Sequence, residues 1–444
     1  MFRSRSRTGR RSSGTARPPH VVVATRVYTP EPVAAAFRQE ALVQALRRAG
    51  AEVTVLTSAV GGTSLRGASV DRGGARVSRF PVKRDKQGQV RGYASYLSFD
   101  IPLALRLLLR RRMDALVLEP PPTTGLVGMI ASAIRRVPYT FYAADVWSDA
   151  TDSVEGVPTV VRTLVRWAET TVWKRAARVL TISPGVQHRL EELAGPRKGF
   201  VMVGNGIDTD TFTPGGPDAG EDPEGSSPYF VYAGTVSEWQ GAGVFVEAFA
   251  RLRESRPEAR LLFFSEGSGR EQLEAAVREK GIGGIEFRNK IPPVEVARYL
   301  RGAVAGLSSI TPGQGYEFAL PTKIYAATAC GTPVIHAGEG AAHDRIRDNG
   351  LGWTCEYSVP AVAEAMDRAL AGERAPEPEH LRAWTLAKAS LRGCADTAAG
   401  EVLDSLTLNG SDDLSEPGDP YGHHCEGERQ CRGEQPGHDQ GERI

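Results

Sequence analysis

The sequence predicts an α/β protein with two doubly wound, parallel-sheet domains that face each other across a cleft. Two observations carry this prediction. Short apolar runs of strand length alternate with segments of helical apolar periodicity from His20 to about Ala399. A segment rich in Gly, Pro and acidic residues, 205–228, divides this alternation into two series. Each series would form its own sheet, with its ligand site at the carboxyl ends of the strands.

Composition limits the class of protein. The chain has 444 residues, of which 41% are hydrophobic, so two cores of ordinary size are expected. The net charge of +1 gives no indication of a nucleic-acid partner. The five cysteines form no CxxC pair, which predicts neither a disulfide framework nor a metal site and fits a reducing cytoplasm. Cys425 and Cys431 lie near His423 and His424 in a polar tail, where we expect no metal site.

Targeting and membrane segments are not expected from the pattern. Residues 1–19 are rich in Arg, Ser and Gly and lack the apolar core of a signal peptide. No apolar run reaches the roughly 18–20 residues that a membrane-spanning helix needs. We therefore expect a cytoplasmic protein, and a position at the inner face of the membrane is the alternative. Residues 1–19 and 407–444 are predicted to be disordered tails.

The first domain is assigned to residues 20–204. Gly50 should end its first helix, and Pro158 suits the first turn of a later one. The region 61–92 contains short strand-like pieces and a basic loop. The predicted strands are 20–25, 52–57, 115–119, 139–143, 178–182 and 200–203, and the predicted helices are 33–49, 96–112, 124–136, 158–177 and 184–193.

The second domain is assigned to residues 229–378, after the linker 205–228. A C-terminal helix, 380–399, is expected within the segment 379–406. This segment either stays with the second domain or crosses back to the first. The predicted strands are 229–233, 260–264, 285–287, 303–310, 333–336 and 352–354, and the predicted helices are 242–254, 271–280, 294–301, 323–330 and 359–371.

The stretch 320–340 carries the first functional signal. It has the pattern of a loop, a short helix and a strand, with Pro321 and Thr322 at the helix start and Gly331 at its end. The helix N-terminus would offer free N–H groups, and Lys323 would add a full positive charge. This combination suits a diphosphate. The alternative is an ordinary βαβ core unit with an exposed lysine.

Five segments together resemble a known family. They occur in family order, and the resemblance spans nearly all of 20–399. The segments are TISPGVQHRL (181–190), VGNGIDTDTFTP (203–214), YAGTVSEWQG (232–241), FFSEGSGREQLEAAV (263–277) and PTKIYAATACGTPVI (321–335). The chain resembles retaining glycosyltransferases of family 4, which have two Rossmann-like domains in the GT-B arrangement. TRVYTPEPVAAAFR (25–38) and YAADVWSDA (142–150) look most like the polysaccharide and cell-surface glycan branch.

The resemblance implies a hexosyltransferase-type enzyme. It would move a sugar from a nucleoside-diphosphate sugar to a glycan, lipid-linked or small-molecule acceptor, with retention of configuration and without a metal or other cofactor. Lys323 would stabilise charge on the leaving phosphates in the transition state. The implied donor-binding residues are Gly234, Thr235, Gln240, Gly241, Glu266, Gly267, Lys290, Ile291, Lys323 and Ile324.

The sequence departs from the family at acidic and basic positions. The usual pair of glutamates would fall at Phe318 and Ala326, and neither is acidic. Glu317 is one residue from the first position and is the catalytic alternative there. The usual Arg and Lys of the first phosphate loop are Thr235 and Gln240 here. Lys323 therefore carries more of the expected electrostatic task.

An acceptor site is expected in the first domain. Asp145 and Asp149 flank Trp147 after a predicted strand, and Asp145 would orient or polarise an acceptor hydroxyl. Ala144 replaces the family's usual His, so a side-chain base is not indicated. The alternative is a pair of solvated loop acids. The expected acceptor-binding residues are Arg26, Arg38, Asp145, Trp147 and Asp149.

Other interpretations stay open. The missing acids favour a non-catalytic nucleotide-sugar binding protein of the same fold as the second hypothesis. A nucleotide-sugar epimerase is a weaker third, with His336 and His343 as its candidates. A nicotinamide dehydrogenase is disfavoured because no GxGxxG follows the first strand. The mixed Leu and Arg run 106–112 predicts either a surface helix with a charged end or a peripheral membrane contact.

Overall fold

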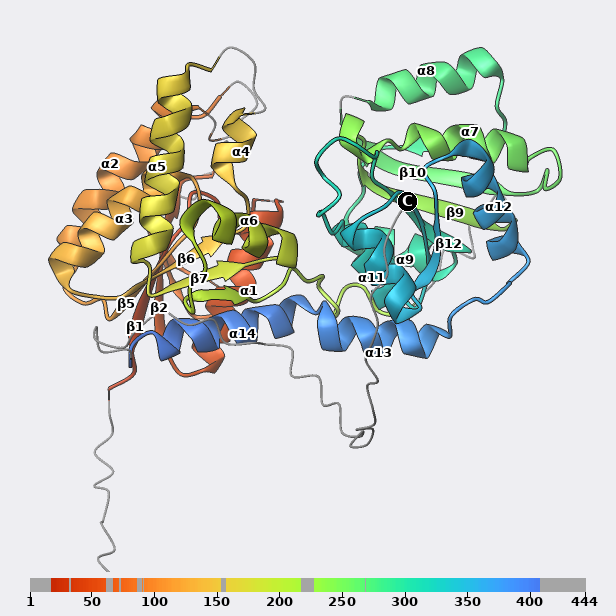
Figure 1. Ribbon diagram of the computed structural model, residues 1–444. Helices are drawn as coiled ribbons and strands as arrows, with labels where there is room; N and C mark the ends of the chain where they lie inside the picture. The colour runs from red at the N-terminus through yellow and green to blue at the C-terminus, as the bar shows by residue number, and fades with distance from the viewer. Residues whose placement is uncertain are drawn as a thin grey trace, which may run out of the picture.

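A computed structural model describes residues 17–31, 33–60, 67–71, 73–85, 90, 92–152, 157–216, 227–267 and 269–407. Two α/β domains follow one another along the chain, and a pair of helices runs beneath both (Figure 1). The predicted fold class is confirmed. The predicted disordered tails lie outside the described residues except for 17–19 and 407, and so does the centre of the predicted linker.

The first domain contains an eight-stranded sheet with the order β3-β4-β2-β1-β5-β6-β7-β8. Neighbouring strands are parallel except β3 and β4, which are antiparallel. The strand order reverses between β1 and β5, where a doubly wound sheet opens its ligand crevice. The strands are β1 (His20–Ala24), β2 (Glu52–Ser58), β3 (Gly67–Val70), β4 (Arg76–Phe80), β5 (Ala115–Leu118), β6 (Tyr139–Ala143), β7 (Arg178–Thr181) and β8 (Phe200–Met202).

Helices cover both faces of this sheet, which explains why the central strands are apolar throughout. One face is buried by α1 and by α14, a helix from the end of the described chain. The other face is buried by α2, α3, α5 and α6. The helices are α1 (Ala34–Arg48), α2 (Tyr93–Leu108), α3 (Pro122–Arg135), α4 (Trp147–Asp152), α5 (Thr159–Arg175) and α6 (Pro184–Ala194).

The second domain contains a six-stranded parallel sheet with the order β11-β10-β9-β12-β13-β14. Here the order reverses between β9 and β12. The strands are β9 (Tyr229–Thr235), β10 (Arg260–Glu266), β11 (Ile285–Arg288), β12 (Ala305–Ser309), β13 (Val334–Ala337) and β14 (Gly352–Cys355).

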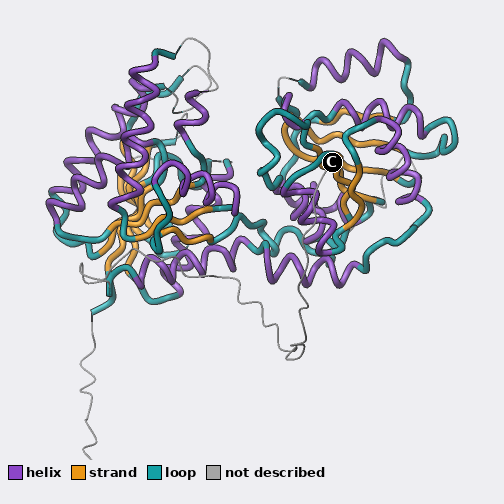
Figure 2. Tube along the Cα trace, viewed as in Figure 1, coloured by secondary structure: helices purple, strands orange, loops and turns teal. Residues whose placement is uncertain are grey.

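Two layers of helices also enclose the second sheet (Figure 2). α7 and α12 pack on one face, and α9, α10, α11 and α13 contribute to the core on the other. The elements are η1 (Glu238–Gln240), α7 (Gly243–Leu252), α8 (Arg270–Lys280), α9 (Pro293–Arg301), α10 (Thr322–Ala329), α11 (Ala341–Asn349), α12 (Val359–Leu370), α13 (Pro378–Lys388) and α14 (Leu391–Asp404).

The end of the described chain returns to the first domain. The sequence predicts one helix over 380–399, but α13 and α14 are separate, because the Ser390 hydroxyl caps α14 by accepting from Gly393 N at 3.3 Å. At the break, Leu391 N donates to Ile207 O at 2.8 Å, so the two chain crossings between the domains are bonded together. α14 then buries Ala398 and Val402 against α1.

Further details differ from the sequence-based expectation. The helices α4 and α11 were not predicted. Thr322 does not cap α10, because it is the first helical residue, and the N-cap residue is Pro321, which has no side-chain bond to offer. Within the described residues, no helix is both long and apolar enough to cross a bilayer.

Candidate functional site

A cavity of about 400 Å³ lies at the carboxyl ends of β9 and β12, where the order of the second sheet reverses. The N-terminal turn of α10 forms part of its wall through Pro321, Thr322, Lys323 and Ala326. No side chain caps this helix, so its first N–H groups and the positive end of its dipole are available to an anion. The cavity therefore has the position and the polarity of a phosphate-binding site.

Lys323 is the dominant charge in this wall. Its Nζ is buried, has no hydrogen-bond partner among the described residues, and lies 3.6 Å from the centroid of the Tyr232 ring. Burial lowers the pKa of the Lys323 ammonium to about 7. A buried cation without a counter-ion is unfavourable in the free protein, and an anionic ligand would relieve that cost.

The carboxyl end of β9 brings backbone close to this ammonium. Gly234 has φ +133°, and a Cβ built there would lie 3.5 Å from Lys323 Cε. Thr235 and Gln240 line the same cavity, and Thr235 Oγ1 donates to Gln240 Oε1 at 3.3 Å. Gly241 lies behind them with φ +56°, and its carbonyl accepts from the Tyr357 hydroxyl at 2.7 Å. The Gly241 turn thus supports the cavity and is not among its lining residues.

The far side of the cavity is formed after β10 and β11. Lys290 and Ile291 line it, and Lys290 Nζ pairs with Glu266 Oε1 at 2.9 Å. Glu266 and Gly267 do not line the cavity, and Glu266 is linked to it only through this ion pair. Gly267 has φ +122°, and an added Cβ would lie 2.6 Å from Val236 O. Ile324, on α10, points into the core of the domain and does not line the cavity.

The two positions that lack the family's acids have different surroundings. Ala326 lines the cavity with a methyl group. Phe318 is half exposed and reaches α6 of the first domain, where a Cβ on Gly185 would lie 2.6 Å from Phe318 Cβ. Phe318 also stacks with Tyr316, which stacks on Trp239 at 4.8 Å between ring centroids. Sequence reasoning missed this aromatic series, whose only signal was the spacing of Tyr316 and Phe318.

Glu317 lies in the loop before α10. Its Oε1 accepts from Gly313 N at 2.6 Å. Hydrogen bonds from backbone N–H groups, with its own the largest contribution, lower the pKa of this carboxyl. The group is therefore ionised at neutral pH and fixes its own loop. It does not line the cavity at the carboxyl ends of β9 and β12.

The first domain gathers several expected acceptor residues at its own strand-order reversal. Arg26 follows β1, and its guanidinium lies 4.4 Å from the Tyr96 ring centroid and 5.7 Å from that of Trp147. Its Nη2 donates to Pro120 O at 3.2 Å, and its Nε is buried without a partner among the described residues. Arg26 and Trp147 are thus brought together as the sequence predicted.

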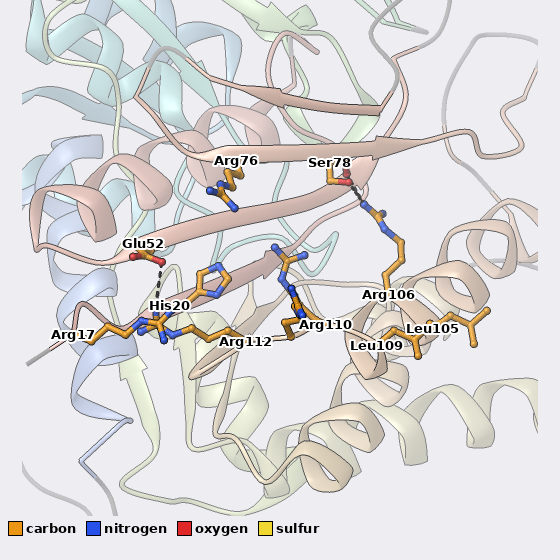
Figure 3. A pocket seen from close by; sticks show the side chains of 11 residues that line it. Arg17, His20, Glu52, Arg76, Ser78, Leu105, Arg106, Leu109, Arg110 and Arg112 are labelled. Atoms are coloured by element: carbon orange, nitrogen blue, oxygen red, sulfur yellow. Dashed lines mark hydrogen bonds and ion pairs between the residues drawn. The ribbon is translucent and has the colours of Figure 1, made fainter.

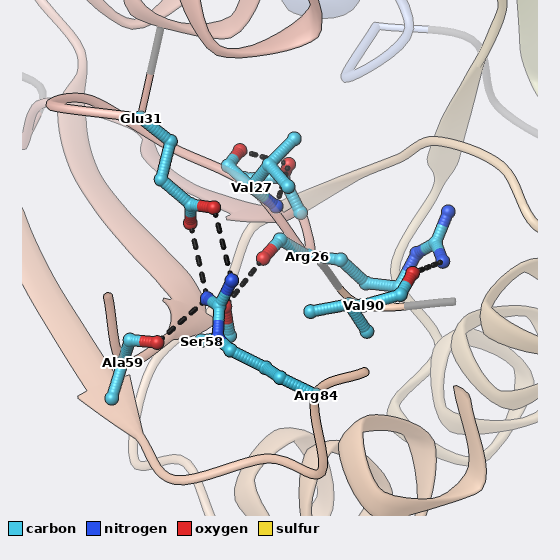
Figure 4. A network of polar contacts seen from close by, with 8 residues as sticks. Arg26, Val27, Glu31, Ser58, Ala59, Arg84 and Val90 are labelled. Atoms are coloured by element: carbon cyan, nitrogen blue, oxygen red, sulfur yellow. Dashed lines mark hydrogen bonds and ion pairs between the residues drawn. The ribbon is translucent and has the colours of Figure 1, made fainter. Parts of the chain in front are cut away.

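A network of polar contacts holds the loop that carries Arg26 (Figure 4). Arg84 donates to both Glu31 carboxylate oxygens at 3.1 and 3.2 Å and to Ala59 O at 2.6 Å. Ser58 Oγ accepts from Arg84 and donates to Arg26 O at 2.7 Å. The position of Arg26 is therefore fixed from its backbone as well as from its guanidinium.

A buried carboxylate that sequence reasoning did not single out completes this region. Glu119 follows β5 and accepts from the Thr25 hydroxyl and from Gln39 Nε2, the latter at 2.8 Å. Burial raises the pKa of Glu119, and Arg38 and Arg26 oppose this shift. The guanidinium of Arg38 lies 5.1 Å from the Tyr142 ring centroid. The available signal was an acid directly after a buried strand.

The two expected aspartates are not equivalent. Asp145 is exposed at the end of β6. Asp149 makes a bidentate pair with Arg189, with both distances 2.8 Å. Between them, the N–H groups of Trp147 and Ser148 donate to the buried Glu169 carboxylate at 2.8 and 2.9 Å. Burial raises the pKa of Glu169 to about 7.

His336 and His343, the candidates of the epimerase hypothesis, do not line the cavity at the ends of β9 and β12. His336 is buried in β13, with Nδ1 3.2 Å from Ser308 Oγ, and burial lowers its pKa to about 3. It is neutral at physiological pH. Among the described residues, no group of three or more His, Cys, Asp or Glu is placed to hold a metal ion. The Cys and His residues at 423–431 lie outside the described residues.

Comparisons with known proteins agree with this architecture. Residues 34–206 match the model of the glycosyl transferase 4-like domain, and residues 227–372 match that of glycosyl transferases group 1. The fold is that of sucrose-phosphate synthase from Thermosynechococcus elongatus (TM-score 0.69, 17% identity, 88% of this chain and 99% of that chain). It is also that of Anabaena Alr3699/HepE in complex with UDP and glucose (TM-score 0.64, 15% identity, 87% and 99%).

Curated proteins match a shorter stretch. A D-inositol 3-phosphate glycosyltransferase from Frankia alni is 30% identical over 45% of this chain and 51% of its own length. A GDP-mannose-dependent alpha-(1-6)-phosphatidylinositol monomannoside mannosyltransferase from Mycolicibacterium smegmatis is 26% identical over 44% and 53%. The chain spans about half the length of these curated relatives. The domain matches and the fold define the GT-B class of glycosyltransferases. Within it, the chain belongs to the family 4 type.

Proposed function

We propose that the protein transfers a sugar from a nucleoside-diphosphate sugar to a glycan, lipid-linked or small-molecule acceptor, with retention of anomeric configuration. One observation carries the proposal: the buried Lys323 ammonium has no counter-ion in the described part of the chain and lies beside the uncapped N-terminus of α10 in the cavity wall. That arrangement suits the charge that grows on a departing diphosphate. The names of the relatives support a nucleotide-sugar donor, since one is GDP-mannose-dependent.

The acceptor is assigned to the first domain. Arg26, Arg38 and Trp147 lie near the carboxyl ends of its strands, and Asp145 is exposed at the same edge. In the proposed mechanism the leaving phosphate accepts the proton of the acceptor hydroxyl on the same face of the sugar, so no side-chain base and no metal are needed. Asp145 orients the hydroxyl. We place the reaction in the cytoplasm at the inner face of the membrane, with a peripheral contact.

The first test is nucleotide binding. Thermal shift with UDP, GDP and dTDP compares the wild type with Lys323→Ala and with the control Lys174→Ala, an exposed lysine on α5. One nucleotide should raise the melting point of the wild type and the control by mass action, and Lys323→Ala should lose most of that shift. If no nucleotide shifts any folded sample, the proposed nucleotide-sugar donor is contradicted, and an undiminished shift in Lys323→Ala would show that the donor site is wrongly placed.

The second test separates transfer from binding alone. With the nucleotide sugar identified by the first test, a transfer assay in excess EDTA should yield product whose anomeric configuration, measured by NMR, matches that of the donor. Binding without turnover on any glycan, lipid-linked or small-molecule acceptor would favour the non-catalytic hypothesis. Inversion, or loss of activity in EDTA, would contradict the proposed mechanism.

A further inference from the structure

A second cavity, of about 540 Å³, lies in the first domain away from the donor site. It is formed at the amino ends of β1, β2 and β4, next to the last turn of α2 (Figure 3). The acceptor residues lie at the opposite, carboxyl edge of the same sheet. A ligand in this cavity would therefore leave that carboxyl edge unoccupied.

The cavity has a strong excess of positive charge. Six arginines and one glutamate line it. That glutamate, Glu52, and the nearby Asp114 both pair with Arg112, at 3.2 and 3.0 Å. Among the described residues, Arg76, Arg106 and Arg110 have no acidic side chain within ion-pair distance. Burial is the larger cause that lowers the pKa of Arg110, and repulsion by the positive charge of Arg76 lowers it further.

Two arginines present unused donors to this space. Arg106 Nη1 and Arg110 Nε are buried and have no hydrogen-bond partner among the described residues. Arg106 is held in place from its other side, because Nη2 donates to Ser78 O at 2.9 Å and the guanidinium lies 4.3 Å from the Phe80 ring centroid. Buried unpaired donors on fixed cations are costly unless an anion accepts from them.

An exposed apolar surface adjoins the cavity. Leu105 and Leu109 both line it, yet they are 59% and 81% exposed. With Ile101, 61% exposed, they repeat every four residues and so share one face of α2. The neighbouring helix α3 adds Ile130 and Ile134, which are also exposed. Aliphatic side chains beside clustered arginines match the two chemistries of an anionic lipid surface.

We propose that this cavity binds the headgroup phosphate of an anionic phospholipid, while Leu105 and Leu109 enter the boundary between headgroups and acyl chains. A phosphate oxygen would accept from Arg106 Nη1 and Arg110 Nε, and Arg76 would neutralise the remaining charge. The inference rests on the peripheral contact included in the proposed function, but it is independent of the donor site and of sugar transfer.

Vesicle sedimentation tests the proposal. Wild-type protein should sediment with phosphatidylcholine vesicles that contain phosphatidylglycerol and stay in solution with phosphatidylcholine alone. Because each arginine near an anionic surface contributes about 1 kcal/mol, the double variant Arg76→Gln/Arg110→Gln should bind at least tenfold more weakly. Leu109→Ser should also reduce binding. The matched controls are Arg251→Gln/Arg278→Gln and Leu386→Ser, which change exposed residues of α7, α8 and α13.

The variants should remain folded, because removing mutually repelling arginines relieves repulsion, and their melting points should equal or exceed that of the wild type. Their nucleotide shift should be unchanged, which separates this proposal from the donor site. Equal binding by the arginine variant and its control would overturn the proposal. Binding of inorganic phosphate that depends on Arg76 and Arg110, without vesicle binding, would assign the cavity to a soluble anion and overturn it as well.

Discussion

At the scale of single residues, Lys323 has the least ordinary environment of the candidate site. Its ammonium is buried against an aromatic ring, and no acid of the described residues pairs with it. An ion pair would hold the charge permanently and would compete with a ligand. Without one, the protein maintains an unstable charge that a diphosphate can neutralise, so the same feature that costs folding free energy contributes to binding.

The lowered pKa of Lys323 makes donor binding depend on pH. Below pH 7 the ammonium is already charged, and binding leaves its protonation unchanged. Above pH 7 the free protein has lost the proton, and the bound diphosphate restores it by raising the pKa. Affinity for the nucleotide sugar should therefore fall about tenfold per pH unit above pH 7, with uptake of one proton. Titration calorimetry in buffers of different ionisation enthalpy measures both effects.

The variant Lys323→Met provides the control for this pH dependence. It should bind weakly at every pH, with no linked proton. Wild-type affinity that stays constant from pH 6 to pH 9 would show that the ammonium stays charged in the free protein up to pH 9. That result would contradict the lowered pKa of Lys323.

Cavity residues near the carboxyl ends of strands could be predicted from sequence, because parallel strands end at a common edge. Gly234 at the end of β9, Lys290 after β11 and Lys323 in the first turn of α10 all line the cavity. Contacts between residues far apart in the chain could not be predicted in this way. The approach of Phe318 to Gly185 and the burial of Glu119 depend on packing that no local pattern records.

At the scale of elements, most strands and helices were predicted to within a few residues, since two covering layers leave long apolar runs in the strands. The exceptions include α4, α11 and the break before α14, and the first and last of these depend on tertiary partners. α4 forms where Glu169 of α5 accepts from its first N–H groups. The break before α14 forms where Ile207 accepts from Leu391 N.

Removal of the Glu169 carboxylate should affect α4 and the Trp147 it carries. Glu169→Ala leaves two buried N–H groups without an acceptor, so we expect a loss of about 1–3 kcal/mol in the free energy of unfolding. The acceptor KM should rise severalfold, and nucleotide affinity should not change. Denaturant unfolding and transfer kinetics measure these effects. Glu169→Gln, which keeps one acceptor oxygen, should lie between the two proteins, and an unchanged acceptor KM would contradict the role of α4.

At the scale of the whole molecule, the two domains meet where Phe318 approaches α6. Gly185 permits this contact because a Cβ there would lie 2.6 Å from Phe318 Cβ. The proposed donor and acceptor sites are on different domains, so their separation would depend on how closely these two surfaces approach. Reacting groups must be placed to within about 1 Å for efficient transfer.

The variant Gly185→Ala tests this dependence. The added methyl should hold the domains apart and lower kcat/KM by about tenfold or more, with donor affinity unchanged because the cavity lies within one domain. Phe318→Gly removes the opposing Cβ. In the Phe318→Gly background, Gly185→Ala should therefore lower kcat/KM much less than it does in the wild type. Steady-state kinetics of the four proteins form a double-mutant cycle, and additive losses would show that the contact does not govern domain approach.

The return of α14 to the first domain has a consequence for biosynthesis. Ribosomes produce the chain from its N-terminus, and domains generally begin to fold in that order. Here α14 supplies part of the apolar cover for the sheet face that also packs against α1, through Ala395, Ala398 and Val402. Those residues emerge after every strand of the second sheet. The first domain therefore stays incompletely folded, with α1 partly uncovered, until the second domain has been translated. The helix α14, which is synthesised after the second sheet, then completes the fold of the first domain.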